Sequence, residues 1–104
     1  MTEKDVKLKK GVFNIGVLGY KDEWIEVVGY LAQVPSFFGV YKDNDSDWIL
    51  THLPSGLAVC SPKTLTQARR IIVELMAMGK WNRSAKEIMA DKDFCRSVEE
   101  IVRR

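Results

Sequence analysis

The side chains that could take part in covalent chemistry are one histidine and the hydroxyl and thiol groups that follow it. His52 is the single histidine among 104 residues, and Ser55 and Cys60 lie further along the chain. A serine or cysteine nucleophile needs a positioned base, which an imidazole can provide. However, Ser55 falls in the turn sequence Pro54-Ser55-Gly56, and nothing near it predicts an oxyanion site. A hydrolase built around His52 is therefore the weakest of three functional hypotheses, and we expect no catalytic residues.

The sequence also argues against a bound metal. Zinc needs three or four protein ligands, and Cys60 and Cys95 are not paired at the usual ligand spacing. The acidic residues 43–47 resemble the start of a calcium loop, but Trp48 occupies the glycine position and Pro54 the position of the bidentate glutamate. We expect no metal and no cofactor, and we interpret the two cysteines as reduced core thiols.

The elements that must position these groups centre on a hairpin over residues 48–60. Apolar and β-branched residues on both sides of Pro54 and Gly56 predict two strands joined by a tight turn. With a bulge in that turn, we expect one face to carry Ile49, Thr51, Leu53, Leu57 and Val59, and the other to carry Trp48, Leu50, His52, Ala58 and Cys60. Both faces are largely apolar, which predicts that helices, a partner chain or a ligand cover both.

A helix should follow the hairpin. Thr64 and Gln67 form a predicted capping box, and Gly79 stands where a C-terminal cap is expected. Its apolar stripe comprises Leu65, Ala68, Ile71, Ile72, Leu75 and Met76. Ser84 with Glu87 predicts the start of a second helix, and Asp91 or Asp93 is expected to cap a last one.

The first half of the chain predicts strands. Residues 12–18 and 37–42 are expected to be strands, and the acidic residues 43–47 form a turn. Residues 22–34 are compatible with a strand or an amphipathic helix. We favour the strand because a glycine inside a helix, here Gly29, costs about 1 kcal/mol relative to alanine.

Strands followed by helices predict the α+β class. We expect an antiparallel sheet of about four or five strands, followed by two or three C-terminal helices packed on it. The length suits a single domain over residues 1–104, with residues 1–10 as a mobile leader. The sequence has neither a membrane-spanning run nor a signal peptide, so we expect a cytoplasmic protein.

A protein-binding module is the first functional hypothesis. Aromatic residues are enriched at protein interfaces, and an acidic loop can contact a basic partner. The candidate residues are Trp24, Tyr41, Asp43, Asp45, Asp47 and Trp48. A homodimer formed through an edge strand would also cover the second apolar face of the hairpin.

A nucleic-acid-binding regulator is the alternative. The net charge of +2 is too small to argue for it alone. Basic residues around the main helix could nevertheless contact phosphates, and a tryptophan among them could stack on bases. These candidates are Arg69, Arg70, Lys80, Trp81, Arg83 and Lys86.

The residues from Trp48 to Ala58, followed by Thr64 and the Gln67-Ala68 helix, resemble small proteins carried by bacteriophages and prophages. The resemblance covers about a third of the chain. Such proteins commonly bind a host protein, and some inhibit host defence. The resemblance therefore implies an accessory factor that blocks a host protein sterically, without catalytic turnover. It identifies no target and no functional residues.

Overall fold

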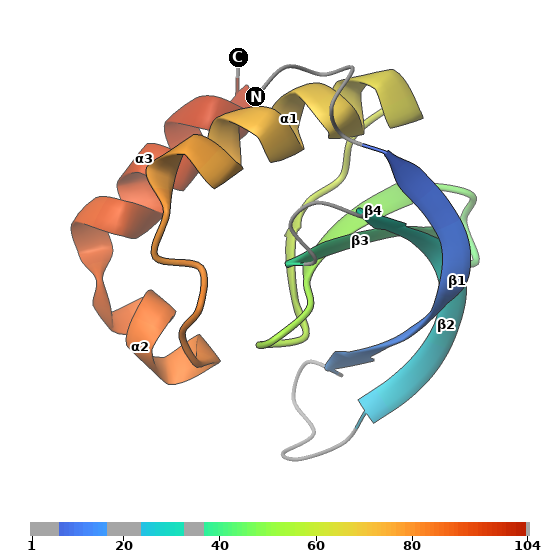
Figure 1. Ribbon diagram of the computed structural model, residues 1–104, viewed down its shortest axis with the longest axis horizontal. Helices are drawn as coiled ribbons and strands as arrows, with labels where there is room; N and C mark the ends of the chain where they lie inside the picture. The colour runs from blue at the N-terminus through green and yellow to red at the C-terminus, as the bar shows by residue number, and fades with distance from the viewer. Residues whose placement is uncertain (1–6, 17–23, 33–36, 104) are drawn as a thin grey trace.

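The computed structural model describes residues 7–16, 24–32 and 37–103, and it shows an antiparallel sheet followed by helices (Figure 1). The strands pair in chain order: β1 (Leu8–Gly16), β2 (Trp24–Ala32), β3 (Phe38–Lys42), β4 (Trp48–His52) and β5 (Leu57–Cys60). The helices are α1 (Leu65–Met78), α2 (Ala85–Ala90) and α3 (Lys92–Arg103). The predicted α+β class is confirmed.

The ambiguous segment of the sequence forms a strand. β2 pairs with β1 along its whole length, with Gly29 opposite Gly11 and Val28 opposite Val12. Leu8 to Lys10 belong to β1, so the ordered sheet begins inside the predicted leader. The remaining parts of these predictions, residues 1–6, 17–18, 22–23 and 33–34, lie outside the described residues.

The sheet is strongly curled, and glycines at close contacts permit the curl. A Cβ atom on Gly29 would lie 2.3 Å from the carbonyl oxygen of Val40, so β2 and β3 approach more closely than other residues allow. The Phe13 ring lies over Gly39 and reaches Tyr41 edge-on, with 6.1 Å between ring centroids. Phe13 is buried. A side chain of β1 therefore fills the concave face of β3.

The curl brings the first strand back to the last hairpin. The amide of Gly16 donates to the carbonyl oxygen of Gly56 over 2.9 Å, at the turn between β4 and β5. Thr51, whose side chain lies on the concave face, is 1% exposed. One apolar face of the hairpin was expected to be covered by a partner in a homodimer. In the structure, β1 and β2 of the same chain cover this face.

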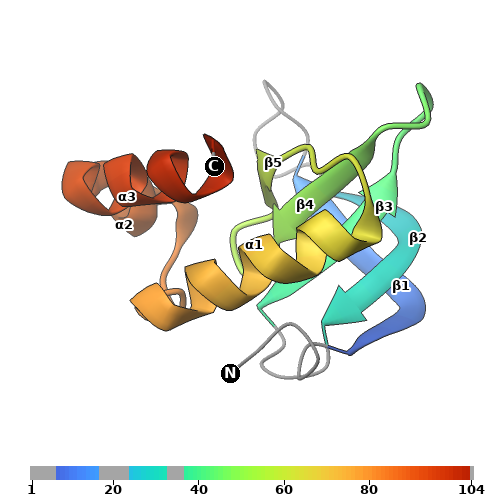
Figure 2. The same ribbon diagram turned by 90° about the horizontal axis from the view of Figure 1, so that it is seen from above.

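Helix α1 covers the other face of the sheet. Its Ala68, Ile71, Ile72 and Leu75 are buried in one cluster with sheet residues such as Leu50. Thr64 caps the helix as predicted, accepting from the Gln67 amide over 3.0 Å. The Gln67 side chain bonds to the amide of Lys63 instead of completing the predicted box at Thr64. Figure 2 shows α1 lying along the sheet, with α2 and α3 beyond it.

The faces of the β4–β5 hairpin differ from the prediction. Leu57 lies opposite His52 and Ala58 opposite Thr51, and the register shifts between Leu50 and Thr51. The bulge predicted for the turn occurs instead within the strand pair. As a result, Leu57 shares a face with His52, and Ala58 with Thr51.

Two glycines with positive φ differ in whether a side chain would have room. Substituting each of them therefore distinguishes the conformational cost of a side chain from its steric cost. Gly56 (φ 72°) and Gly79 (φ 69°) both adopt backbone angles that side chains disfavour. A Cβ on Gly56 would lie 2.7 Å from the Gly16 nitrogen and 2.3 Å from the Trp24 ring, whereas nothing lies within 4 Å of a Cβ on Gly79. We expect Gly79→Ala to lower the free energy of unfolding by about 1–2 kcal/mol. Gly56→Ala should lower it by about 2 kcal/mol more.

Urea denaturation followed by circular dichroism measures both variants. Equal losses of stability for the two substitutions would show that the contact between β1 and the β4–β5 turn does not constrain the fold.

Candidate functional site

Trp81 lies at the centre of the helical end of the molecule. Gly79 and Lys80 both have positive φ, and this turn after α1 directs the Trp81 side chain inward. The indole Nε1 donates to the carbonyl oxygen of Leu75 over 2.6 Å. The ring is 3% exposed and packs edge-on against Phe38 and Phe94. Trp81 therefore joins the sheet, α1 and α3.

His52 connects the sheet to this tryptophan by a hydrogen bond. Its Nε2 lies 2.7 Å from the carbonyl oxygen of Trp81, and its Nδ1 lies 2.8 Å from Ser55 Oγ. Because a carbonyl oxygen only accepts, Nε2 carries a proton; in the neutral ring Nδ1 then accepts from the Ser55 hydroxyl, which also lies 3.3 Å from the His52 carbonyl oxygen. Burial lowers the pKa of His52, although the hydrogen bond to Trp81 opposes this shift. The imidazole is therefore neutral at pH 7.

Short contacts hold α2 and α3 next to Trp81. The predicted box of Ser84 and Glu87 starts α2. Asp91 accepts from the Phe94 amide over 3.1 Å at the start of α3, which confirms one of the two predicted caps. Arg83 forms an ion pair with Asp91 at 3.2 Å, and its guanidinium lies over the Phe94 ring.

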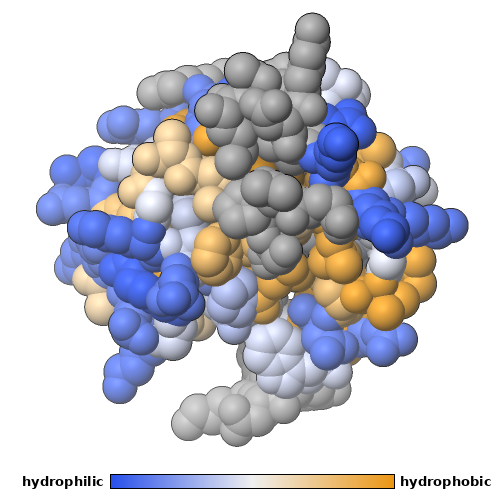
Figure 3. Space-filling view, viewed as in Figure 1, coloured by the Kyte–Doolittle hydropathy of each residue, from blue (hydrophilic) through white to orange (hydrophobic). Residues whose placement is uncertain are grey.

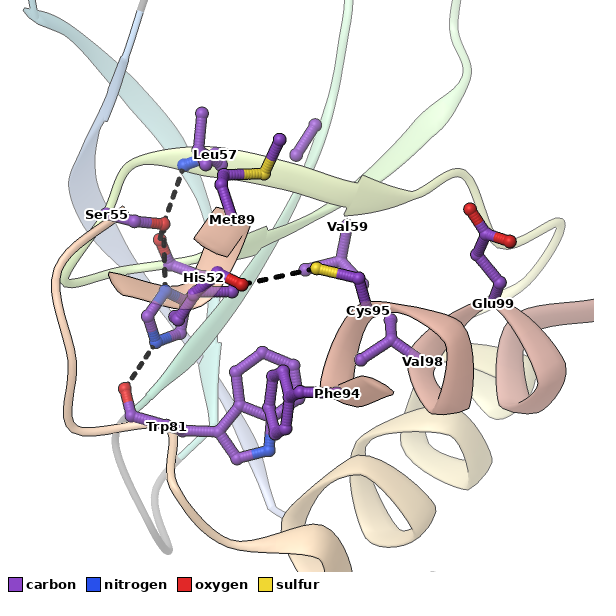
Figure 4. Close-up of a pocket in the computed structure, with 12 residues that line it drawn as sticks. His52, Ser55, Leu57, Val59, Trp81, Met89, Phe94, Cys95, Val98 and Glu99 are labelled. Carbon is purple, nitrogen blue, oxygen red and sulfur yellow. Dashed lines mark hydrogen bonds between the residues drawn. The ribbon is translucent and has the colours of Figure 1, made fainter. Parts of the chain in front are cut away.

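A cavity of about 230 Å³ lies between the β4–β5 hairpin and these helices (Figure 4). Its walls are almost entirely apolar, with His52 and Ser55 at one side and Glu99 as the single acidic lining residue. Met89, at 65% exposed, is a lining residue that also faces solvent. The lining residues are His52, Ser55, Leu57, Ala58, Val59, Trp81, Ile88, Met89, Phe94, Cys95, Val98 and Glu99.

The contact between His52 and Ser55 is the one that a general base and its nucleophile would make. However, the nearby backbone N–H donors form hydrogen bonds within the turn. The Leu57 amide donates to Ser55 Oγ over 3.2 Å, and the Gly56 amide donates to the His52 carbonyl over 2.8 Å. Acyl transfer needs donors aimed at the developing oxyanion. Because these two amides are engaged within the hairpin, the contact between His52 and Ser55 is best explained as structural.

Of the two cysteines, Cys95 lines the cavity and Cys60 does not. Both thiols are free. Burial raises the pKa of Cys60 to about 11, so the thiolate is scarce at pH 7. The Cys95 thiol lies 3.3 Å from the carbonyl oxygen of Ile88 and links α3 to α2. In the described part of the chain, no three histidine, cysteine or carboxylate side chains are grouped to hold a metal ion.

The acidic candidates for protein binding lie on the β3–β4 turn. Asp43 has a structural role, because its Oδ1 accepts from the amides of Asp45 and Asp47 over 2.9 and 3.0 Å. The side chains of Asp45 and Asp47 are exposed. The turn therefore presents two exposed carboxylates on a loop that the third one stabilises.

The aromatic candidates do not form one surface. Tyr41 packs on Phe13 inside the curled sheet, and burial raises its pKa. Trp48 is half-buried beneath the Lys42 ammonium group, 4.9 Å from the ring. Trp24 lies against the turn that follows β4, whereas the other candidates lie at the turn that precedes it.

The alternative nucleic-acid site is also dispersed. Trp81 is buried, so its ring offers no face for a base to stack on. Arg70 pairs with Glu74, and Arg83 with Asp91. Arg69 and Arg70 belong to α1, Lys80 and Arg83 to the connector after it, and Lys86 to α2, and Lys80 and Lys86 are exposed. The basic residues are thus distributed over α1, the connector and α2.

A second exposed apolar surface lies on β1 and β2. Val12 and Val28 face each other across the two strands and are 55% and 61% exposed. Figure 3 shows hydrophobic surface on the side of the molecule where these strands lie. The valines do not line the cavity at the helical end, so this surface provides a control for it.

Sequence reasoning missed the helical wall of the cavity. Phe94, Cys95 and Val98 have the spacing of an ordinary apolar stripe on a helix, and the sequence contains no signal for what such a stripe faces. The high exposure of Met89 could not be predicted from its spacing to neighbouring apolar residues.

Comparison with protein-family models, with curated proteins and with solved structures finds no match to the chain. No helix in the described ranges is long and apolar enough to cross a membrane.

The pKa of His52 predicts acid sensitivity. Because folding lowers this pKa, the unfolded chain binds more protons below its ordinary value of about 6.5. The contribution of His52 is fully present above that pH and is lost as the pH falls toward the lower folded-state value. We expect the free energy of unfolding to decrease between about pH 7 and 5.

His52→Gln is the matched control, since glutamine can donate to the Trp81 carbonyl but does not titrate. It should be less stable at pH 7 by about 1–3 kcal/mol and show a flatter pH profile. Urea midpoints across this range measure the effect. A variant profile parallel to that of the wild type would show that His52 does not cause the pH dependence.

Proposed function

We propose that the chain is a non-enzymatic protein-binding module, and that the cavity between β5 and the C-terminal helices receives an apolar side chain of its partner. The observation that carries the proposal is an open apolar cavity whose lining includes the solvent-exposed Met89. Methionine is flexible and polarisable, and it is common on surfaces that bind other proteins. The site would act by contact alone.

The size of the cavity supports a side chain over a larger ligand. Pockets for drug-sized molecules and cofactors occupy about 300–1,000 Å³, and this cavity occupies about 230 Å³. An engineered apolar cavity of about 150 Å³ admits benzene. One aromatic or large aliphatic side chain would therefore fill the site.

The resemblance of residues 48–58 to small phage and prophage proteins supports a host protein as the partner, such as a component of a defence system. Binding would block the partner sterically. The proposal places the chain in the cytoplasm, where its free thiols would stay reduced.

A charge at the rim of the cavity should abolish binding without unfolding the chain. Met89→Glu changes a side chain that is 65% exposed, so we expect stability to change by about 0.5 kcal/mol or less. Val28→Glu is the control, because Val28 is 61% exposed and lies on β2. Immobilised wild type and Val28→Glu should retain the same protein from a bacterial lysate, and Met89→Glu should lose it by about tenfold or more.

Quantitative mass spectrometry of the retained proteins reads out the experiment. Equal retention by Met89→Glu, or no protein enriched by the wild type over a blank support, would contradict the proposal.

A further inference from the structure

A second hollow lies on the sheet face that α1 covers, next to the first residue of that helix. Its volume is about 400 Å³. The strands β1 to β4 and the start of α1 all contribute to it, and its lining in the described part of the chain shares no residue with the cavity at the helical end. The side chains that line it are Lys10, Val28, Tyr30, Lys42, Trp48 and Leu65.

The strand register places the sheet residues of this hollow on one face. Lys10 lies opposite Tyr30, and Lys42 lies opposite Trp48. The Tyr30 and Trp48 rings contact each other, with 6.1 Å between their centroids, so both pairs point to the same side. Val28 precedes Tyr30 by two residues and shares its face. The β2 residues Val28 and Tyr30 therefore lie between lysines of the two neighbouring strands.

The face is open to solvent where the hollow lies. Val28 is 61% exposed, and both lysine side chains are exposed. Tyr30 and Trp48 are half-buried, so each ring keeps part of its surface accessible. Because these exposed fractions belong to the folded chain, a ligand reaches the rings and the lysines without any rearrangement of the sheet.

The charges of the hollow favour an anionic ligand. Lys10 and Lys42 are the charged side chains of its described lining. Within the described residues neither ammonium group forms an ion pair, and that of Lys42 lies over the Trp48 ring. An adjoining hollow shares Lys42 and Trp48 and adds Lys63 and Asp47. The cations therefore outnumber the acids along this surface, which attracts negative charge.

We propose that this hollow binds single-stranded nucleic acid. A base stacks on the accessible ring surface of Tyr30 and Trp48, and Lys10 and Lys42 contact the flanking phosphates. Proteins that bind single strands combine these two features, a basic surface along the backbone and aromatic side chains beneath the bases. A duplex would engage the lysines alone, because its bases are already stacked and paired. The site is separate from the cavity proposed to bind a protein.

Fluorescence anisotropy of a labelled single strand of about 12 nucleotides tests the inference. Lys42→Glu should weaken binding by about tenfold or more at about 50 mM salt. Lys86→Glu makes the same change of charge at an exposed residue of α2 and should change binding by less than about twofold. Replacing Lys10 and Lys42 together by glutamine should reduce the slope of log K against log salt by about 1.4, since each phosphate contact contributes about 0.7.

Tryptophan emission tests whether a base lies on Trp48. A stacked base quenches the indole, so wild-type emission should decrease on binding. Trp48→Phe keeps an aromatic ring and should bind within about threefold of the wild type. The same variant should lose most of the quenching, because the buried Trp81 is out of reach.

Variants at the two sites should have opposite effects. Val28→Glu should weaken oligonucleotide binding and retain the captured protein, and Met89→Glu should do the reverse. Absence of single-strand binding at about 50 mM salt, or equal weakening by Lys42→Glu and Lys86→Glu, overturns the proposal. Equal affinity for duplex and single strand, or tighter binding of a polyglutamate peptide, also overturns it, because the rings would then not select unpaired bases.

Discussion

The hydrogen bond from His52 to the Trp81 carbonyl joins the two halves of this fold. His52 is 2% exposed at the end of β4, and Trp81 is 3% exposed in the connector after α1. The bond spans 2.7 Å, and the indole then packs on Phe94 at the start of α3. Because a buried carbonyl without a donor costs about 1–3 kcal/mol, this contact helps to determine where the connector meets the sheet. The two short helices that follow are thereby positioned beyond the edge of β5, and the cavity lies between them and the hairpin.

The curl of the sheet determines which surfaces remain for binding. Phe13 and the contact between Gly16 and Gly56 cover the concave face, so the apolar hairpin is enclosed by its own chain on one side and by α1 on the other. The expectation of a dimer depended on an uncovered face. Among the described residues, the apolar surfaces that remain open include the cavity beside β5 and the valine pair on β1 and β2.

Local patterns predicted the elements well because each depends on neighbouring residues. The stripe and caps of α1, the box at Ser84 and Glu87, and the strand containing Gly29 all follow from spacing and conformational preference. The hydrogen-bond partner of His52 does not follow from local patterns, since Trp81 lies 29 positions away in the sequence and accepts through its backbone carbonyl. Every residue has a backbone carbonyl, so residue type does not indicate which carbonyl accepts a hydrogen bond. The role of Trp81 was not predictable from residue type either, because a tryptophan among basic residues is compatible both with an exposed ring that stacks on bases and with a buried core residue.

Amide hydrogen exchange of the chain, free and bound to the protein that it captures, tests the location of the site most directly. Binding should slow exchange in β5 and along α3, and should leave exchange in the acidic turn at residues 43–47 and on the β1–β2 surface unchanged. Slowed exchange confined to that turn, to the valine pair or to the basic face of α1 would contradict it, because the partner would then lie away from the cavity that His52 and Trp81 organise.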